Sequence, residues 1–179
     1  MLLLRRLAAV DDVLDAHRDA LGRDYEAYRH HVYRVANLCI AQLSRADDDV
    51  EKASIAAVFH DLGIWTDRTF DYLEPSVRLA HDYLTRRGRA DWIAEVTAAI
   101  RQHHKLSRYD GPHARLVEAF RRADWIDVTL GLRAHGLSRA RLRAAAAEWP
   151  RAGFHLMLAR LALRRLATHP WNPLPMVRL

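Results

Sequence analysis

An imidazole and a carboxylate stand side by side in this sequence, at the end of an apolar run. The run is Ala-Ala-Val-Phe-His-Asp-Leu-Gly at positions 56–63, and the pair is His60 and Asp61. A polar group that is buried without a partner costs roughly 2–7 kcal/mol. A fold that buries this pair must therefore bring further polar or cationic groups to it from other parts of the chain.

Two other positions supply ligand-type groups on either side of this pair. His31 precedes His60 by 29 residues, and Asp124 follows Asp61 by 63 residues. Imidazole nitrogen combined with carboxylate oxygen suits a divalent cation such as Mn, Fe, Mg, Co, Ni or Zn. Two imidazoles and two carboxylates also leave coordination positions open for water and substrate. We therefore predict that these four residues bind a divalent metal.

Composition indicates one compact domain. The chain has 179 residues, half of them hydrophobic, and shows neither a Ser/Gly-rich linker nor an internal repeat.

The sequence also indicates where the protein is found. Its single cysteine, Cys39, fits a reducing compartment, the apolar N-terminal stretch is too short for an export signal, and no run is long enough to span a membrane. We expect a cytoplasmic protein without membrane partners. The net charge of +6 favours a small anionic substrate.

Most of the chain is predicted to be helical, because apolar residues recur every three or four positions in segments rich in Ala, Leu, Arg and Glu. Gly22 is expected to end the first helical region, and Gly63 to end the helix that carries His60 and Asp61. The predicted helices cover 2–21, 25–44, 50–62, 75–87, 92–104, 115–132, 137–148 and 154–168, with loops over 65–74 and 105–112 and an extended tail over 170–179.

Four basic or imidazole positions are candidates for substrate binding and proton transfer. Arg34 lies one turn after His31, where it could hold a phosphate or serve as an ordinary surface arginine. His103 and His104 end a predicted helix, where they could protonate a leaving group, bind a second metal or simply complement the helix dipole. Lys105 follows them and could bind a substrate phosphate.

Further candidates stand near the predicted loops. Glu74 could reach a metal or act as a general base, or it could only favour the N-terminus of a helix. His81 could be a ligand of a second metal or face solvent on an amphipathic helix. Asp127, one turn after Asp124, could accept a hydrogen bond from a ligand imidazole. Aromatic residues that could line a pocket for a ring are Trp65, Tyr72 and Tyr109.

The order His, His-Asp, Asp resembles the HD-domain superfamily of metal-dependent phosphohydrolases. The resemblance extends from His31 to Asp127 and includes the motifs His-Asp-Leu-Gly at 60–63, Ile-Arg-Gln-His-His at 100–104 and Ala-Asp at 123–124. It implies an all-α fold, a compact helical bundle in which the four predicted ligands bind the metal. Taken with the composition, the resemblance leads us to expect a single domain of this type over 1–179, with a motif core over about 25–130 and C-terminal helices 137–168 packed on it.

The sequence departs from one branch of that family. Ile64 stands where the cyclic-dinucleotide phosphodiesterases have Lys, their Gly-Tyr-Pro signature is missing, and Glu74-Pro75 replaces their His-Pro. The resemblance therefore argues against a cyclic-dinucleotide substrate, and a second metal would need Glu74 or His81 as a substitute ligand.

We expect a metal-dependent hydrolase of a small phosphorylated, nucleotide-like substrate that uses a metal-activated water. Two alternatives stay open. The first is a diiron oxygenase of the same family, and the second is a non-catalytic binding module. Nucleic acid is disfavoured as a partner, because the basic residues after Asp124 alternate with Leu and Ala at helical spacing. The oligomeric state is left open.

The candidate catalytic residues are Asp61, His103, His104 and Glu74, and the candidate substrate-binding residues are Arg34 and Lys105.

Overall fold

The computed structural model describes residues 3–43, 46–173 and 175–177. All regular structure in these ranges is helical, which confirms the predicted all-α class. None of the described helices is long and apolar enough to cross a membrane. The elements are α1 (Ala8–Ala16), α2 (Arg18–Leu21), the 3-10 turn η1 (Gly22–Asp24), α3 (Tyr25–Ile40), α4 (Asp47–Phe59), α5 (Gly63–Thr66), α6 (Leu73–Arg86), the 3-10 turn η2 (Ala90–Trp92), α7 (Ile93–Gln102), α8 (Ala114–Val128), α9 (Arg139–Glu148) and α10 (Phe154–Thr168).

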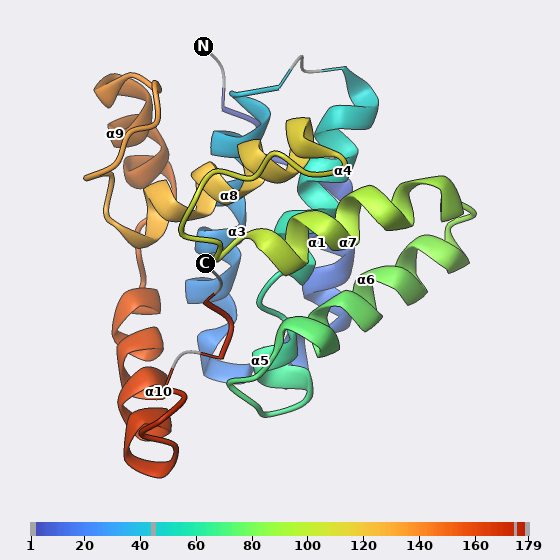
Figure 1. Ribbon diagram of the computed structural model, residues 1–179. Coiled ribbons are helices and arrows are strands. Elements are labelled where there is room, and N and C mark those ends of the chain that lie inside the picture. The colour runs from blue at the N-terminus through green and yellow to red at the C-terminus, as the bar shows by residue number, and fades with distance from the viewer. Residues whose placement is uncertain (1–2, 44–45, 174, 178–179) are drawn as a thin grey trace.

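Helix α3 forms the centre of the bundle (Figure 1). It packs against α8 and α4, and also contacts α1, α9 and α10. Of its residues only Glu26, Arg29 and His30 are not buried. A helix that is apolar nearly all round must be covered on all sides. The neighbours of α3 therefore define the layers of the fold, and any polar side chain on its last three turns lies in the core.

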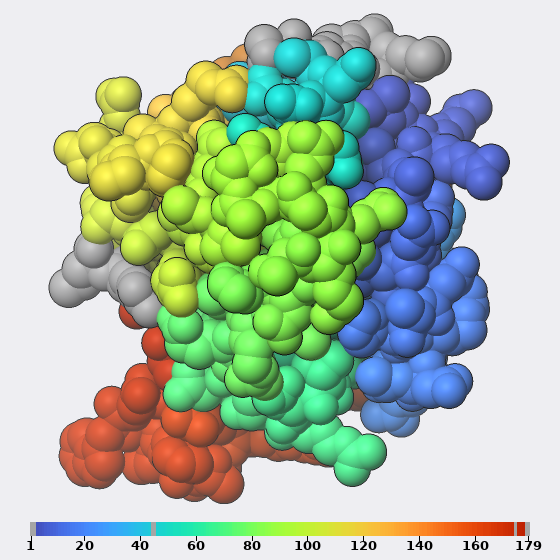
Figure 2. Space-filling view, turned by 90° about the vertical axis from the view of Figure 1, so that its right-hand side faces the viewer, coloured from blue at the N-terminus to red at the C-terminus, as the bar shows by residue number. Residues whose placement is uncertain are grey.

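Helices α6 and α7 form a hairpin that packs on α4 and α8. Figure 2 shows this hairpin covering one face of the molecule, with α10 projecting below it. The helix predicted from Pro75 begins two residues earlier, at Leu73, with the proline in its first turn. The predicted loop before it is shorter than expected, because α5 continues through Thr66.

The prediction that Gly63 ends a helix is wrong, since this glycine begins α5. Its φ is not positive, so no left-handed cap requires it. A Cβ atom at Gly63 would lie 2.7 Å from the carbonyl oxygen of Tyr72 and 2.8 Å from Cβ of Pro75. Glycine is needed because α5 and the start of α6 are in direct contact, and this contact fixes the turn that follows His60 and Asp61.

Several predicted helix boundaries differ from those of the structure. The first helix begins at Ala8, because the described residues before it are not helical. Helix α3 ends at Ile40, and the end predicted for it at 44 lies outside the described residues. Helix α8 ends at Val128, because Leu130 and Gly131 adopt left-handed backbone conformations with φ of 58° and 78°.

The C-terminal tail is not extended where it is described. Turns form near 170–171 and 175–176, while 174 and 178–179 lie outside the described residues. Met176 is buried against Ile64, Tyr72 and Leu73, in a small cluster apart from the main core. The tail therefore folds back onto the segment that joins α5 to α6.

Candidate metal centre

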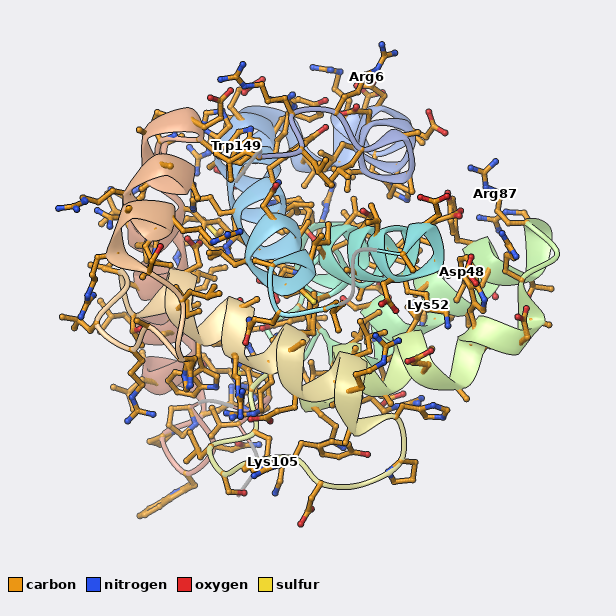
Figure 3. The ribbon with its side chains drawn as sticks, turned by 90° about the horizontal axis from the view of Figure 1, so that it is seen from above. Arg6, Asp48, Lys52, Arg87, Lys105 and Trp149 are labelled. Carbon is orange, nitrogen blue, oxygen red and sulfur yellow. The ribbon has the colours of Figure 1, made fainter. Side chains whose placement is uncertain are left out.

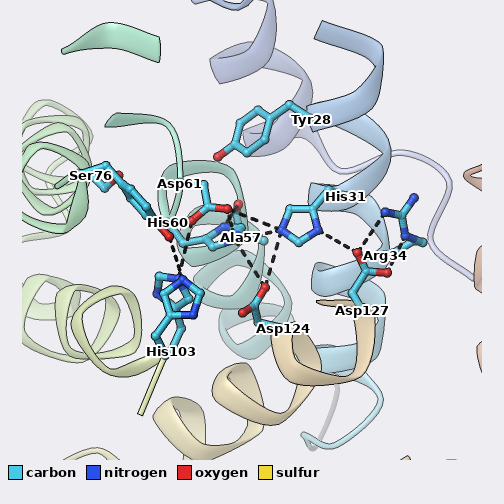
Figure 4. A network of polar contacts seen from close by, with 12 residues as sticks. Tyr28, His31, Arg34, Ala57, His60, Asp61, Ser76, His103, Asp124 and Asp127 are labelled. Atoms are coloured by element: carbon cyan, nitrogen blue, oxygen red, sulfur yellow. Dashed lines mark hydrogen bonds and ion pairs between the residues drawn. The ribbon is translucent and has the colours of Figure 1, made fainter. Parts of the chain in front are cut away.

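The four predicted ligands converge from three separate parts of the chain (Figure 4). His31 projects from α3, His60 and Asp61 from the turn after α4, and Asp124 from α8. All four are buried, and none is more than 4% exposed. This convergence is what the resemblance implies. Whether a metal binds there depends on how the ligand atoms are arranged.

The ligand atoms face one another across a small volume. Nε2 of His31 lies 3.0 Å from Nε2 of His60. Asp61 Oδ2 lies 3.8 Å from the first nitrogen and 3.3 Å from the second. Asp124 Oδ1 lies 3.6 Å and 3.7 Å from the same two nitrogens. Atoms that each bind one divalent cation at about 2.0–2.2 Å lie about 3.0–3.5 Å apart. His31, His60 and Asp61 place one ligand atom each within 4.8 Å of one another, so these three could hold a single ion. Asp124 approaches the same two nitrogens but does not belong to that group.

Hydrogen bonds from the Nδ1 atoms of His31 and His60 fix the tautomers of the two imidazoles. Nδ1 of His60 donates to the carbonyl oxygen of Ala57 at 2.7 Å, and Nδ1 of His31 donates to Asp127 at 2.7 Å. A carbonyl or carboxylate oxygen can only accept, so both Nδ1 atoms carry hydrogen. In the neutral rings both Nε2 atoms then present lone pairs to each other and to two carboxylates. Such a group of acceptors needs a cation between its members.

A second group of ligand atoms shares Asp61. Asp61, His103 and His104 place one ligand atom each within 4.8 Å of one another. His103 is oriented as the first two imidazoles are, since its Nδ1 donates to the carbonyl oxygen of Ile100 at 2.6 Å. Its Nε2 lies 3.6 Å from Asp61 Oδ1, and neither atom has a hydrogen-bond partner among the described residues. Together with His104, two buried acceptors left in this way could hold a second cation.

Burial and neighbouring charges shift the acidities of the cluster. Burial lowers the pKa of His31 to about 4, and it raises the pKa of Asp124 to about 8. Burial alone would also raise the pKa of Asp61, but the imidazoles of His60 and His103 outweigh it and hold that pKa well below its ordinary value. Without a cation, the site therefore combines the neutral imidazole of His31, the readily ionised carboxylate of Asp61 and the carboxyl group of Asp124, which retains its proton at neutral pH.

One protein family model covers all the residues of this cluster. A family model described as the HD domain matches residues 28–129, which is more than half of the chain and contains every member of the cluster. This chain belongs to the HD domain family. No curated protein and no solved structure matches it. Membership and the buried His/Asp cluster support each other, since the matched region includes most of α3, the turn after α4, the end of α7 and all of α8.

Arg34 does not lie where a phosphate at the metal would be. It is almost fully buried, and its guanidinium donates to both oxygens of Asp127, at 2.6 Å and 2.9 Å. Its remaining Nη1 donates to the carbonyl oxygens of Trp149 and Pro150. Figure 4 shows it on the far side of Asp127 from His31. The expected phosphate contact is thus replaced by an ion pair that holds Asp127 in place, and four of the five N–H groups of the buried guanidinium donate within the protein.

Asp127 is the partner of a ligand imidazole, as predicted. Burial alone would raise its pKa, but hydrogen bonds from His31 and Arg34 outweigh burial and hold the pKa far below its ordinary value of 3.8. The residue therefore stays a carboxylate. A chain from Arg34 through Asp127 to His31 orients the imidazole and makes its Nε2 a better donor to a metal.

Glu74 and His81 stay outside the cluster of this HD domain. Glu74 forms a bidentate ion pair with Arg101 on the surface, at 2.9 Å and 3.0 Å. His81 lies on the exposed side of α6 next to Asp82. The structure thus does not bring either residue to the second metal position, because a pairing available at the surface holds Glu74 and the helix phase turns His81 outward.

Lys105 lies in the loop after α7, at the edge of the molecule (Figure 3). Its carbonyl oxygen accepts a hydrogen bond from Arg121 at 3.1 Å, which fixes the backbone of the loop directly after His104. His104 is half-buried, and its Nε2 shares a 2.7 Å hydrogen bond with the hydroxyl of Tyr72. The predicted role of Lys105 toward a substrate stays a prediction.

Aromatic side chains that the sequence analysis did not select complete the walls. The ring of Phe154, the first residue of α10, stacks on His31 with centroids 4.0 Å apart. Tyr28 packs against both His31 and His60, and its hydroxyl donates to the carbonyl oxygen of Val58. Tyr28 precedes His31 by three residues, so helical periodicity could have indicated it. Phe154 comes from outside the matched family region, and no local pattern indicates its contact.

Proposed function

We propose that this HD domain is a metal-dependent hydrolase of a small phosphorylated, nucleotide-like substrate. The observation that carries the proposal is the set of three imidazoles whose Nδ1 atoms are held by acceptors, so that each Nε2 faces a carboxylate. His31, His60, Asp61 and Asp124 would hold one divalent cation, and Asp61, His103 and His104 a second. Bound there, the cation would supply Lewis acidity and lower the pKa of a water molecule.

The residues around the cation sites would hold protons at defined atoms. Burial and the neighbouring His103 imidazole keep the pKa of His104 well below its ordinary value, so its ring is neutral at physiological pH. Burial keeps the pKa of Tyr72 well above its ordinary value, so its hydroxyl retains its proton beside Nε2 of His104. With these pKa shifts neither group is a ready proton donor at neutral pH, so the pair would orient a leaving-group oxygen by hydrogen bonding, and the proton-donor role expected for His104 stays a prediction.

The charge of the chain favours the substrate class. The formal net charge is +6, and a cation pair would add to it inside a low-dielectric core. Lys105, next to His104, is positioned in sequence to hold a phosphate as a point charge. We further propose a cytoplasmic location, since the single cysteine, Cys39, is buried and free.

The test is release of phosphate from a panel of nucleotide monoesters and diesters, with Mn²⁺, Fe²⁺, Co²⁺, Ni²⁺, Mg²⁺ or Zn²⁺ added separately. Asp124→Ala removes a carboxylate that contacts both imidazoles and should lower turnover by roughly 10³-fold or more, the loss of several kcal/mol of charge stabilisation. Asp82→Ala removes an exposed carboxylate of α6 and is the matched control. Equal turnover by the Asp124→Ala variant and the unmodified chain would disprove the proposal.

A further inference from the structure

A cavity lined by described residues lies apart from the metal centre. Its volume is about 600 Å³, and it is bounded by residues 20–27, by the segment 64–70 and by α10 with the two residues before it. Figures 1 and 2 both place α5 and α10 toward the same end of the molecule. None of the metal-ligand candidates lines it. The volume falls within the range of about 300–1,000 Å³ typical of pockets for small ligands.

Positive charge dominates the rim of this cavity. Four arginines contribute to the lining, and Asp24 is its single acidic residue. Arg68, Arg160 and Arg164 form no ion pair with any residue of the described ranges, and Arg23 approaches Asp24 only to 3.9 Å. Elsewhere on the surface, arginines such as Arg78 and Arg101 are paired with carboxylates at 2.6–2.9 Å. The cavity thus gathers guanidinium groups whose charge is not compensated.

The inner walls are aromatic and apolar. Trp65 and Phe70 line one side, and Met157 and Leu161 of α10 line the other. The indole N–H of Trp65 donates to Asp24 at 3.1 Å, and its ring packs on Tyr28 with centroids 4.6 Å apart. The indole is therefore held rigidly as a wall, which lowers the entropic cost of stacking a ligand ring against it.

One arginine of the rim is held in an unfavourable backbone conformation. Arg68 has a φ of 51°, in the left-handed region that residues with a Cβ rarely adopt. It lies in the segment between α5 and α6, which also carries Phe70, and Trp65 precedes it in α5. Strained residues of this kind are found often at ligand sites.

We infer that this cavity binds a small molecule with two or more phosphoryl groups joined to a planar ring, the chemistry of a nucleoside polyphosphate. Guanidinium groups bind phosphate oxygens in bidentate geometry, and several of them on one rim match a chain of phosphates. The ring would stack on Trp65, since bases stack on aromatic side chains. This inference does not rest on the proposed hydrolase activity, because it concerns binding at a different place.

The cavity is one layer of side chains away from the metal centre. Trp65 reaches it through Tyr28, which packs on His31 and His60. On the other wall, α10 begins with Phe154, which stacks on His31. A ligand that draws α10 toward the 64–70 segment would therefore shift Tyr28 and Phe154, the two aromatic side chains that pack on His31. The same chemistry fits either the remote part of a substrate or a separate effector.

The test is calorimetric titration of the full chain with the β,γ-imido analogue of ATP, with Mg²⁺ matched to the nucleotide, and in parallel with inorganic tripolyphosphate. We expect one binding site, with the analogue about tenfold or more tighter than tripolyphosphate because only the analogue has a ring to stack. Arg68→Gln and Arg164→Gln should each weaken binding about tenfold, the loss of one charge-assisted contact. Both side chains are exposed, so neither change threatens folding.

The matched control is Arg143→Gln, which removes an exposed arginine of α9 outside the cavity and should leave the affinity unchanged. Absence of binding by the analogue, or equal weakening by all three changes, would overturn the inference. So would binding to vesicles of anionic phospholipid without binding of the analogue, which would point to a membrane surface. If ATP is hydrolysed and Arg68→Gln raises the KM for ATP, the bound molecule is a substrate. If the analogue binds but ATP is not hydrolysed, the bound molecule is an effector. Either result supports the site.

Discussion

The metal centre and the arginine-lined cavity use charged side chains in opposite ways. In the metal centre every ionisable residue except the half-buried His104 is buried, and Asp127 is held between Arg34 and His31 by short hydrogen bonds. Around the cavity, Arg68, Arg160 and Arg164 are exposed and unpaired among the described residues. Burial forces each charge to find partners, whereas water tolerates a charge without one. The first region is therefore built by the fold, and the second leaves its charges available to a ligand.

The largest expected difference between the two regions is in the free energy of unfolding when one arginine is removed from each. Arg34→Met leaves Asp127 as an uncompensated buried charge, and the free energy of unfolding should fall by roughly 3–5 kcal/mol. Arg68→Met removes an exposed, unpaired side chain and should change the free energy of unfolding by no more than about 0.5 kcal/mol. Urea unfolding of the two variants measures both values. Similar losses in the two variants would show that the regions do not differ as described.

A smaller effect is expected from the link between Asp127 and the metal ligand. Asp127→Asn keeps the shape of the side chain but removes the negative charge that makes His31 a strong donor, so metal affinity should fall about 10- to 100-fold. Asp82→Asn is the matched control on the surface of α6 and should leave affinity unchanged. Competition with a fluorescent chelator gives both affinities. An unchanged affinity in Asp127→Asn would mean that the chain from Arg34 to His31 serves stability alone.

The last expected effect, about tenfold per pH unit, is the dependence of metal affinity on pH. Burial raises the pKa of Asp124 to about 8 in the metal-free protein, so its carboxyl carries a proton at pH 7 that a metal must displace. Affinity should therefore weaken by about tenfold for each unit that the pH falls below 8, and level off above it. Affinity that is constant between pH 6 and 8 would show that Asp124 is already ionised, or that it is not a ligand.

The contrast also explains what could be predicted from the sequence. His31, His60, Asp61 and Asp124 stood out because ligand-type residues in apolar helical runs require partners, and helices were readily predicted from their periodicity. Asp127 followed from its spacing of one turn after Asp124. Arg34 shows the limit of such spacing, since periodicity places it near His31 but does not reveal that Asp127 and the carbonyl oxygens after α9 occupy its donors.

Contacts between distant segments explain the remaining differences. Gly63 is required by the carbonyl oxygen of Tyr72, which approaches it only in the folded chain. Phe154 covers His31 from a helix more than a hundred residues away, and Glu74 is drawn to Arg101 on the neighbouring helix of the hairpin. The cavity has no sequence motif at all, because its walls come from three separate segments. Such features depend on tertiary packing, which local patterns do not contain.

The most direct test of the central claim is the metal content of the full chain, purified without a chelator or a metal-binding tag and measured by mass spectrometry. We expect at least one divalent ion per chain in the unmodified protein and in Asp82→Ala, and its loss in a folded Asp124→Ala variant. A folded, unmodified chain that holds no metal, even after incubation with Mn²⁺, Fe²⁺ and Zn²⁺, would contradict the claim that the lone pairs of His31 and His60 face a common cation.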